Sequence, residues 1–295
     1  MVTDSPLSSN RIILIKIISL LSLVRWYNIL LITAAQYLAS IFIINDPVLW
    51  KSVLLDVNMF LLALSSSFLI AGGYIINGFY DTEKDMINKP KVAMFNQIVS
   101  KPFRLYCYFG FNFTGVLLGL FVSKEIFVFN LLFSFALWIY SHKLKKIFFI
   151  GNTTATILSI TPFFAVSIYY HTLTPFIMLY VGFIFLIEFT REIIKDMEAV
   201  RGDYIMGYKT LPVEFGLHKT RYLIMAIQCL TISIPFFLYG LKGFSTIMLY
   251  FLFSAVMILI TFFMLFMKSN RINLRAINTI YKLIILSGIA SIVLF

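Results

Sequence analysis

The sequence predicts an all-α fold: a polytopic membrane helical bundle of about nine transmembrane helices, forming a single domain over residues 1–295. The chain is 60% hydrophobic and 13% charged, with a mean hydropathy of +0.93, whereas a soluble domain carries about a quarter charged residues. Its apolar stretches repeatedly reach the roughly 20 residues that a helix needs to cross a bilayer. Runs such as FLFSAVMILITFFMLF do not alternate with polar residues, which excludes an outer-membrane barrel.

The apolar stretches place the helices in order along the chain. We expect spans at 27–45, 53–78, 104–123, 126–141, 148–170, 174–195, 220–240, 244–267 and 276–295. Ahead of them, RIILIKIISLLSL has no small-x-small cleavage site of a signal peptide and leads into RWYN. This run therefore predicts an interfacial or partly embedded helix. Cys107 and Cys229 lie within apolar stretches and indicate neither a disulfide framework nor a metal cluster.

The distribution of basic residues predicts the orientation in the membrane. The N-terminal segment and the loops on its side of the membrane hold 20 of the 24 Lys and Arg residues. The opposite loops hold Lys51, Lys124 and Lys242, and Lys282 lies inside the last expected span. The positive-inside rule places the crowded side in the cytoplasm. Topology and anionic lipid headgroups thus account for the net charge of +11, and no nucleic-acid partner is expected.

Acidic residues are concentrated in two segments on that same membrane face, which hold nine of the 13 Asp and Glu residues. The first segment follows the second span, and it places Asn77, Asp81 and Asp85 four residues apart. Residues at this spacing share one face of a helix. The amide oxygen of Asn77 adds a neutral ligand, or its nitrogen a donor to an anionic substrate.

The second segment ends the sixth span and repeats the same spacing. Glu188, Glu192 and Asp196 step by four, and Asp203 lies seven residues further along. Like charges stacked in this way destabilise a helix unless a cation neutralises them. Mg²⁺ takes oxygen ligands and bridges carboxylates to phosphates, so two facing clusters predict two or three Mg²⁺ ions around a diphosphate. The alternative is that these acids are ordinary helix-end charges solvated at the interface.

At these residues the sequence resembles the UbiA superfamily of intramembrane prenyltransferases, which act on aromatic and lipid acceptors. NGFYDTEKD resembles the first family motif, and REIIKDMEAVRGD resembles the second. Further family segments are similar to RWYNILL, YSHKLKK and GYKTLP in this sequence. Within the family, the digeranylgeranylglyceryl phosphate synthase-like branch is most similar at the segments AGGYIIN and REIIKD. Gly78 and Ala199 depart from the pattern, because acids often stand there in the family.

The resemblance implies a reaction and roles for the residues that match the motifs. Mg²⁺ held by Asp81, Asp85, Asp196 and Asp203 would bind a prenyl diphosphate at the cytoplasmic face, and the departure of diphosphate would leave an allylic carbocation for the acceptor to capture. Asn77 belongs to the same catalytic group. That branch transfers a geranylgeranyl group to a prenylated glycerol phosphate.

Cationic and polar side chains near the motifs are candidate ligands for the diphosphate. They are Arg25, Asn28, Lys145, Arg191 and Lys195. Arg191 and Lys195 can instead pair with acids on their own helix. Glu188 lies deepest in the sixth span, where an ionisable residue is a functional candidate; it either orients or deprotonates an acceptor, or pairs with one of these cations.

Three other functions compete with this hypothesis. An aromatic prenyltransferase would use a hydroxybenzoate, dihydroxynaphthoate or haem-type acceptor at the same motifs. An ion-coupled transporter would place its acids near the bilayer midplane, whereas these acids gather at helix ends. A cytidine-diphosphate-alcohol phosphotransferase would carry an Asp-Gly and Ala-Arg array that this chain lacks.

Overall fold

The computed structural model describes residues 9–243, 245–267 and 271–294. All regular structure in these ranges is helical, as the composition predicts. Residues 244 and 295, which open the eighth expected span and close the ninth, lie outside the described residues. The same holds for the first eight residues and for the cation Lys268.

Nine long helical segments follow one another where the nine spans are expected. They are α2 (Trp26–Leu38) with its π-helical continuation η1 (Ala39–Ile44), α4 (Val57–Tyr80), α7 (Lys101–Val122), α8 (Lys124–His142), α9 (Ile150–Tyr169), α10 (Pro175–Ile205), α11 (Leu211–Lys242), α12 (Met248–Phe266) and α13 (Arg271–Ser291). By length and composition, seven of them are apolar enough to cross a membrane, and α9 and α10 are the other two. The membrane bundle is confirmed, and nine is an approximate count of its spans.

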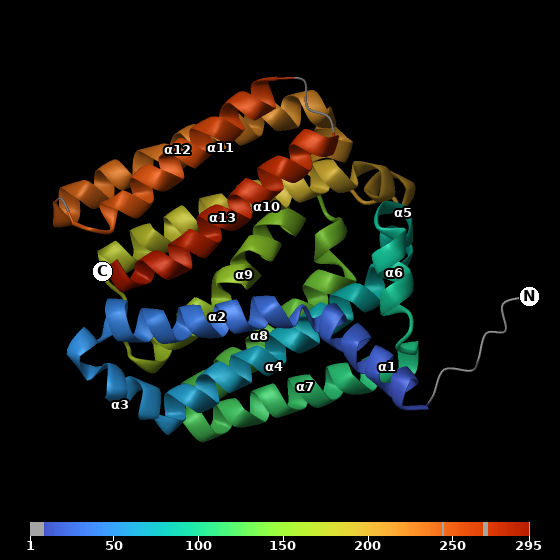
Figure 1. The fold of residues 1–295 in the computed structure, drawn as a ribbon, viewed down its shortest axis with the longest axis horizontal. Helices are drawn as coiled ribbons and strands as arrows, with labels where there is room; N and C mark the ends of the chain where they lie inside the picture. Colours follow the sequence, from blue (N-terminus) through green and yellow to red (C-terminus); the bar gives the residue numbers. More distant parts are fainter. Residues whose placement is uncertain (1–8, 244, 268–270, 295) are drawn as a thin grey trace, which may run out of the picture.

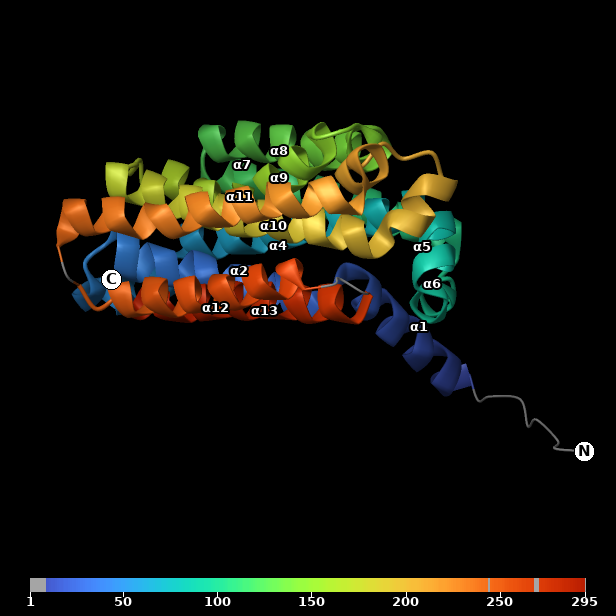
Figure 2. The same cartoon turned by 90° about the horizontal axis from the view of Figure 1, so that it is seen from above.

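Six of these helices close a ring (Figures 1 and 2). α2 packs on α4, α4 on α8, α8 on α9, α9 on α10, α10 on α13, and α13 returns to α2. α7 packs across α4 and α8, while α11 and α12 connect α10 to α13. The largest cluster of buried apolar side chains joins α10, α11, α12 and α13. This packing fixes α10, which carries the second acidic segment, within the ring.

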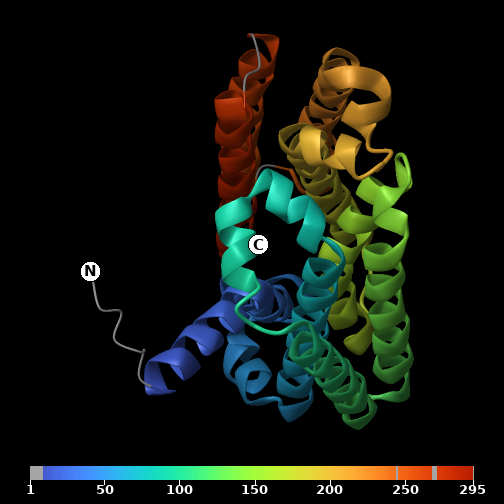
Figure 3. The same cartoon turned by 90° about the vertical axis from the view of Figure 1, so that its right-hand side faces the viewer.

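Short helices complete one end of the bundle. α5 (Thr82–Asn88) and α6 (Pro90–Asn96) lie across that end, as Figure 3 shows. α1 (Ser9–Val24) angles away from the other helices in Figure 2. The remaining short elements are η2 (Pro47–Leu49), α3 (Trp50–Leu55), η3 (Leu144–Lys146) and η4 (Ile292–Leu294). Exposed apolar residues on α1, such as Ile13 and Ile17, suit the interfacial position that remains a prediction for this helix.

Local capping sets the length of the two helices that carry the acidic segments. The side chain of Asp56 accepts a hydrogen bond from the backbone N of Asn58 at 2.9 Å, so α4 begins there. α10 begins in the same way at Thr174, with Pro175 in its first turn. It continues from the expected span end at 195 to Ile205, and the whole second acidic segment is therefore helical.

Candidate active site

The first acidic segment keeps its predicted helical spacing across a kink. The backbone N of Asp81 donates to the carbonyl of Asn77 at 2.9 Å, and that of Asp85 donates to the carbonyl of Asp81 at 2.8 Å. Asp81 itself, with φ −89° and ψ 2°, separates α4 from α5. The three polar side chains consequently follow one another at four-residue steps out of the end of α4.

A close contact between α5 and α10 brings the two acidic segments together. The side-chain amide of Asn88 on α5 donates to the carbonyl of Ala199 on α10 at 3.4 Å. A Cβ at Gly202 would collide with the same Asn88 amide group. Because glycine adds no side chain at this point, α5 can approach α10 and place the two segments at one end of the ring.

Lysine side chains connect the carboxylates of the two segments. Lys84 Nζ on α5 lies 2.9 Å from Oδ1 of Asp203 on α10, and the Asp203 side chain is fully buried. Lys84 also lies over the ring of Tyr208, 4.9 Å from its centroid. The hydroxyl of Tyr208 in turn lies 3.5 Å from Asp81 Oδ1. One lysine and one tyrosine thus link the motifs of α4 and α10.

Lys145, in the loop after α8, binds the first segment directly. Its Nζ donates to Asp81 Oδ1 at 2.7 Å and to Asn77 Oδ1 at 3.1 Å. Both Lys145 and Asp81 are buried. Two candidate catalytic residues and one candidate phosphate ligand, all named from the sequence, therefore meet at one place.

Asp196 has a different partner. Its Oδ2 accepts a hydrogen bond of 2.7 Å from the side-chain amide of Asn152, in the first turn of α9. Together, Asp81, Asp85, Asp196 and Asp203 are called the carboxylate cluster below. Their partners come from α5, α9 and the loop that contains η3, so three elements surround the acids at this end of the ring.

The other candidate ligands lie elsewhere on the ring. The Arg25 guanidinium stacks over Tyr74 of α4 at 5.0 Å from the ring centroid. Asn28 donates to the Tyr74 hydroxyl at 3.1 Å. Arg25 has a left-handed backbone, φ 52°, at the junction of α1 and α2, a conformation that is uncommon for a residue with a side chain.

Arg191 and Lys195 have carboxylate partners on their own helix. Arg191 Nη1 donates to Glu188 at 2.9 Å, and Lys195 Nζ donates to Glu192 at 2.6 Å. Both pairs are spaced three residues apart. The geometry agrees with the same-helix pairing that the sequence offered as an alternative, and it gives Glu188 the structural partner expected for it.

Burial shifts the pKa of three ionisable groups of the site that lie outside the membrane spans. Burial raises the pKa of Asp203, and the charge of Lys84 acts in the opposite direction. Burial and then the charge of Asp81 raise the pKa of Asp85. Burial lowers the pKa of Lys145, although Asp81 opposes that shift. The site thus brings together acids that only partly find cationic partners.

The donor set of this site fits Mg²⁺ although no preformed cage exists. In the described ranges, no three His, Cys, Asp or Glu side chains come close enough to hold one ion together. Mg²⁺ commonly takes only one or two protein carboxylates and completes its shell with waters and substrate phosphates. Asp203 Oδ2 is buried without a hydrogen-bond partner among the described residues. An orphaned carboxylate oxygen beside further oxygen ligands is what such a shared site requires.

Gly78 and Ala199, which stand where the family often has acids, lie at close contacts between helices. A Cβ at Gly78 would lie 2.9 Å from Leu23 of α1, so an acid at this position would have to displace that side chain. Beside it, a pocket between α4, α5, α6 and α7 is lined by residues that include Asp85 and the buried Arg104. At the second departure, the Ala199 carbonyl accepts the hydrogen bond from Asn88.

Sequence reasoning missed three residues that organise the site: Lys84, Asn152 and Tyr208. Lys84 stands between two motif acids, and Tyr208 lies in the GYKTLP segment that resembles the family, so both carried a weak signal. Asn152 lies in a helix that contributes no motif. Its contact with Asp196 depends on the packing of α9 against α10, which no local pattern reports.

Comparison with known proteins finds matches along most of the chain. The model of the UbiA prenyltransferase family matches residues 37–283. A digeranylgeranylglyceryl phosphate synthase of Sulfurisphaera tokodaii is 32% identical over 198 residues, which is 64% of this chain and 69% of that protein. One of Thermococcus gammatolerans is also 32% identical, over 56% of this chain and 60% of its own length.

Solved structures share the fold at lower sequence identity. A structure described for a digeranylgeranylglyceryl phosphate synthase in membranes aligns with a TM-score of 0.68 at 22% identity, covering 94% of this chain and 97% of that one. A UbiA homolog from Archaeoglobus fulgidus bound to DMAPP and Mg²⁺ aligns with a TM-score of 0.66 at 15% identity, covering 93% and 99%. At these identities the likeness establishes the arrangement of the helices.

Proposed function

The chain belongs to the UbiA prenyltransferase family, and from this membership we propose that it transfers a polyprenyl group, geranylgeranyl, from its diphosphate to a lipid acceptor such as geranylgeranylglyceryl phosphate. The reaction takes place in the membrane and depends on Mg²⁺. The named relatives are digeranylgeranylglyceryl phosphate synthases. Fold neighbours from Archaeoglobus fulgidus were solved with DMAPP or GPP and Mg²⁺.

One observation carries the proposal: the two acidic motifs lie against each other at one end of the ring. The Lys84–Asp203 ion pair of 2.9 Å joins α5 to α10, although the two residues are far apart in the sequence. A structural membrane protein has no need for buried acids gathered from separate helices, because burying charge is costly. A binding site for a polyanion and its metal ions accounts for the buried acids, because the metal ions would neutralise their charge.

Each residue of the site has a role in this reaction. Asp81, Asp85, Asp196 and Asp203 would hold Mg²⁺, which when bound supplies neutralisation of the charge on the leaving diphosphate. Lys84 and Lys145, which pair with Asp203 and Asp81, would bind the phosphate oxygens of the donor.

Two further side chains prepare the first motif and the reacting chain. Lys145 donates hydrogen bonds to both Asn77 and Asp81. Asn77 therefore orients the ammonium group of Lys145 toward Asp81. Tyr140 of α8 lies among the charges of Glu192, Asp196 and Asp81. We assign to its ring the stabilisation of the allylic cation, because an aromatic face attracts a cation.

The charge distribution supports an active site on the cytoplasmic side. Lys84, Lys145 and Lys146 belong to the loops that carry most of the basic residues, whereas Lys51 and Lys124 mark the opposite end. The positive-inside rule assigns the first set to the cytoplasm. The diphosphate donor would then reach the carboxylate cluster from the cytoplasm, while its apolar chain lies among the helices.

A transfer assay with two motif variants tests the function. Membranes containing the protein receive labelled geranylgeranyl diphosphate, Mg²⁺ and a panel of glycerol-phosphate lipid and aromatic acceptors. We expect transfer to the lipid class, and a loss of about 10³-fold in Asp81→Asn and in Asp203→Asn, because removing preorganised charge stabilisation costs about 10²–10³. Glu125→Gln, an acid at the start of α8 outside both motifs, is the matched control.

Three outcomes decide between the alternatives. Full activity in both aspartate variants would show that the two-motif metal site is wrong. Labelling of an aromatic acceptor in place of the lipid would support the aromatic prenyltransferase, and an EDTA-resistant solute flux without labelling would support a transporter.

A further inference from the structure

Lys282 is a charged residue within a stretch apolar enough to span a membrane. The stretch runs from Asn273 to Leu294, and Lys282 lies two and a half turns into it. Ionisable residues at this depth are expensive, and they mark functional positions by default. The mechanism described above gives Lys282 no role.

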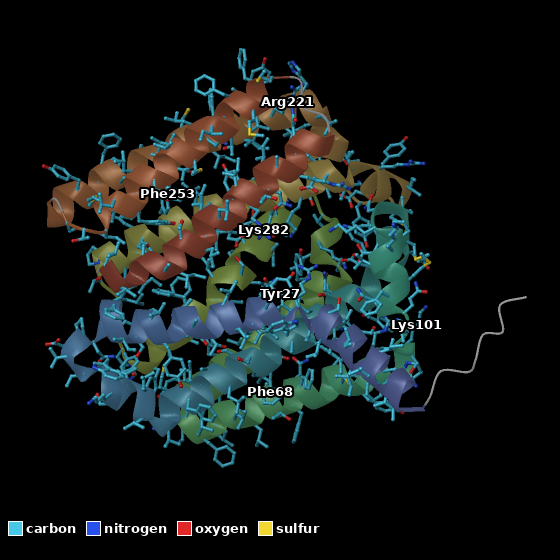
Figure 4. All side chains as sticks on the ribbon, in the orientation of Figure 1. Tyr27, Phe68, Lys101, Arg221, Phe253 and Lys282 are labelled. Atoms are coloured by element: carbon cyan, nitrogen blue, oxygen red, sulfur yellow. The ribbon has the colours of Figure 1, made fainter. Side chains whose placement is uncertain are left out.

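The packing of α13 places Lys282 beside other charges. One turn earlier, Asn278 donates to Glu198 of α10 at 2.8 Å, which fixes the register of α13 against α10. The charges that act on Lys282 belong to Arg191, Glu198, Arg25 and Lys195. In Figure 4, Lys282 on α13 and Tyr27 at the start of α2 label the two helices that flank this region. Figure 1 shows that these helices meet near the C-terminus and diverge toward α5 and α6.

A fifth cation faces the same region. Lys89, at the end of α5, is acted on by the charge of Asp85 and then by those of Arg25, Lys195 and Glu198. Arg25, Lys89, Arg191, Lys195 and Lys282 are therefore called the basic cluster below. They come from the α1–α2 junction, α5, α10 and α13, so the tertiary fold and not one local sequence assembles them.

Their own carboxylates do not balance these cations. In the part of the chain that the structure describes, Arg191 and Lys195 have ion pairs, and Arg25, Lys89 and Lys282 have none. The Nε atom of Arg191 is buried and also has no hydrogen-bond partner there. The acids in this region are Glu188, Glu192 and Glu198, together with Asp85, which acts on Lys89 and Arg25. Four carboxylates against five cations leave a net positive charge.

We propose that the basic cluster binds the phosphate of the lipid acceptor, with Lys282 as the residue that selects a phosphate-bearing lipid. A phosphate monoester carries about −1.5 to −2 charge near pH 7, which a site with net positive charge and three cations without ion pairs attracts. The proposal rests on the proposed function and specifies the acceptor class of that same site. The donor diphosphate remains assigned to the carboxylate cluster with Lys84 and Lys145.

The geometry supports a division of the site into two subsites. Lys84 and Lys145 bind acids that are candidate metal ligands. Arg25 and Asn28 instead meet at Tyr74. A lipid phosphate held between α2 and α13 leaves its apolar chains in the membrane, because α13 there presents exposed apolar residues such as Leu283 and Leu286.

An equilibrium binding measurement without metal or donor tests the subsite. Protein in nanodiscs with EDTA is titrated with labelled geranylgeranylglyceryl phosphate and, separately, with the matching lipid that lacks the phosphate. We expect wild type to prefer the phosphorylated lipid, and Lys282→Met to reduce that preference about tenfold, which corresponds to about 1.4 kcal/mol, because one charged hydrogen-bond donor to the phosphate is lost. Lys282→Arg should keep most of the preference.

The controls separate binding from folding and from the transfer reaction. Arg275→Gln removes an exposed cation from the same helix and should behave as wild type. In transfer assays, Lys282→Met should raise the KM for the phosphorylated acceptor about tenfold and leave the KM for geranylgeranyl diphosphate unchanged.

The outcomes that would overturn the inference differ from those that overturn the function. Equal loss of affinity for both lipids in Lys282→Met, or no loss for either, would reject the phosphate subsite. A wild type that binds the phosphorylated lipid selectively but transfers no prenyl group to it would reject the proposed function and leave the subsite standing.

Discussion

The carboxylate cluster and the basic cluster hold their charges in opposite ways. In the first, each described ion pair joins two elements: Lys84 of α5 with Asp203 of α10, and Lys145 after α8 with Asp81 after α4. In the second, both described ion pairs lie within α10, three residues apart. Cross-element pairs depend on the whole fold, whereas same-helix pairs form wherever the helix forms.

This difference indicates what each cluster does when a ligand arrives. Asp203 and Asp81 would hold a metal ion in place of Lys84 and Lys145, whose ion pairs join separate elements of the fold. The basic cluster keeps its same-helix pairs, and Arg25, Lys89 and Lys282 are left to receive an anion. Loss of a cross-element partner should therefore cost more than loss of a same-helix partner.

The largest expected effect comes from removing a cross-element partner, as in Lys145→Met. Asp81 would lose its 2.7 Å ion pair in a buried site, and breaking such a pair costs about 3–5 kcal/mol. We expect a clear fall in thermal stability and a loss of transfer activity of about 10²-fold or more. Differential scanning fluorimetry and the transfer assay measure the two effects.

A double variant separates two effects of Lys145→Met: the loss of stability from an unpaired buried charge and the loss of activity from a missing catalytic group. Lys145→Met with Asp81→Asn should regain much of the stability, since neither charge remains unpaired, but it should regain no activity. If Lys145→Met unfolds no earlier than wild type, the pair contributes nothing to the fold and the contrast between the clusters is lost.

The second prediction concerns the pH dependence of Mg²⁺ binding at the carboxylate cluster. Burial raises the pKa of Asp203 and of Asp85, so these carboxyls keep their protons to a higher pH than usual. Mg²⁺ needs the ionised form. The half-saturating Mg²⁺ concentration should therefore fall as pH rises, by up to about tenfold per pH unit for each proton displaced, and level off once the folded pKa is passed.

Magnesium titrations of the transfer reaction between about pH 5.5 and 8 measure this dependence. In Asp203→Asn, the half-saturating Mg²⁺ concentration should depend less steeply on pH, because one proton that competes with Mg²⁺ is gone. The residual activity of this variant is used for the titration. A half-saturating concentration that rises with pH would contradict the assignment of these carboxyls as metal ligands.

The sequence predicted the parts of this site that depend on local periodicity. Asn77, Asp81 and Asp85 follow one helical hydrogen-bond ladder, and Asp196 and Asp203 share α10, because four- and seven-residue steps determine a helix face. Seven of the nine long helices also follow from their apolar length. Each of these inferences needed only neighbouring residues.

Tertiary packing decided what the sequence left open. Lys84 meets Asp203, and Asn152 meets Asp196, through contacts between helices that no spacing reports. Arg191 was a candidate diphosphate ligand, and the structure gives it Glu188 as a partner. The sequence contained both alternatives for Arg191; the structure shows the same-helix pair with Glu188, and a role in binding a substrate phosphate stays a prediction.

A third and smaller effect tests the contact that assembles the carboxylate cluster. In Gly202→Ala, the new Cβ would collide with the Asn88 amide and push α5 away from α10. Overpacking of this kind costs about 1–3 kcal/mol, and we expect a several-fold loss of activity through a weaker Mg²⁺ response. Gly182→Ala is the matched control on the same helix, because nothing lies within 4 Å of its added Cβ.

The two glycine variants should change the stability of the protein in opposite directions. Gly182→Ala should leave activity unchanged and raise stability slightly, since alanine is favoured over glycine in a helix by about 0.8–1 kcal/mol. If both variants behave alike, helix propensity dominates at both positions and the α5–α10 contact does not limit the site.

The smallest expected effect comes from a same-helix pair, as in Lys195→Met. Lys195 is 36% exposed in its side chain and pairs with Glu192 within α10, and such i,i+3 pairs contribute about 0.2–0.5 kcal/mol. The fall in unfolding temperature should be barely measurable, far below that of Lys145→Met under the same conditions. Because both variants replace lysine by methionine, the ratio of the two shifts compares the clusters directly. A loss of stability in Lys195→Met as large as in Lys145→Met would mean that α10 depends on its own ion pairs as much as the ring depends on the pairs between helices.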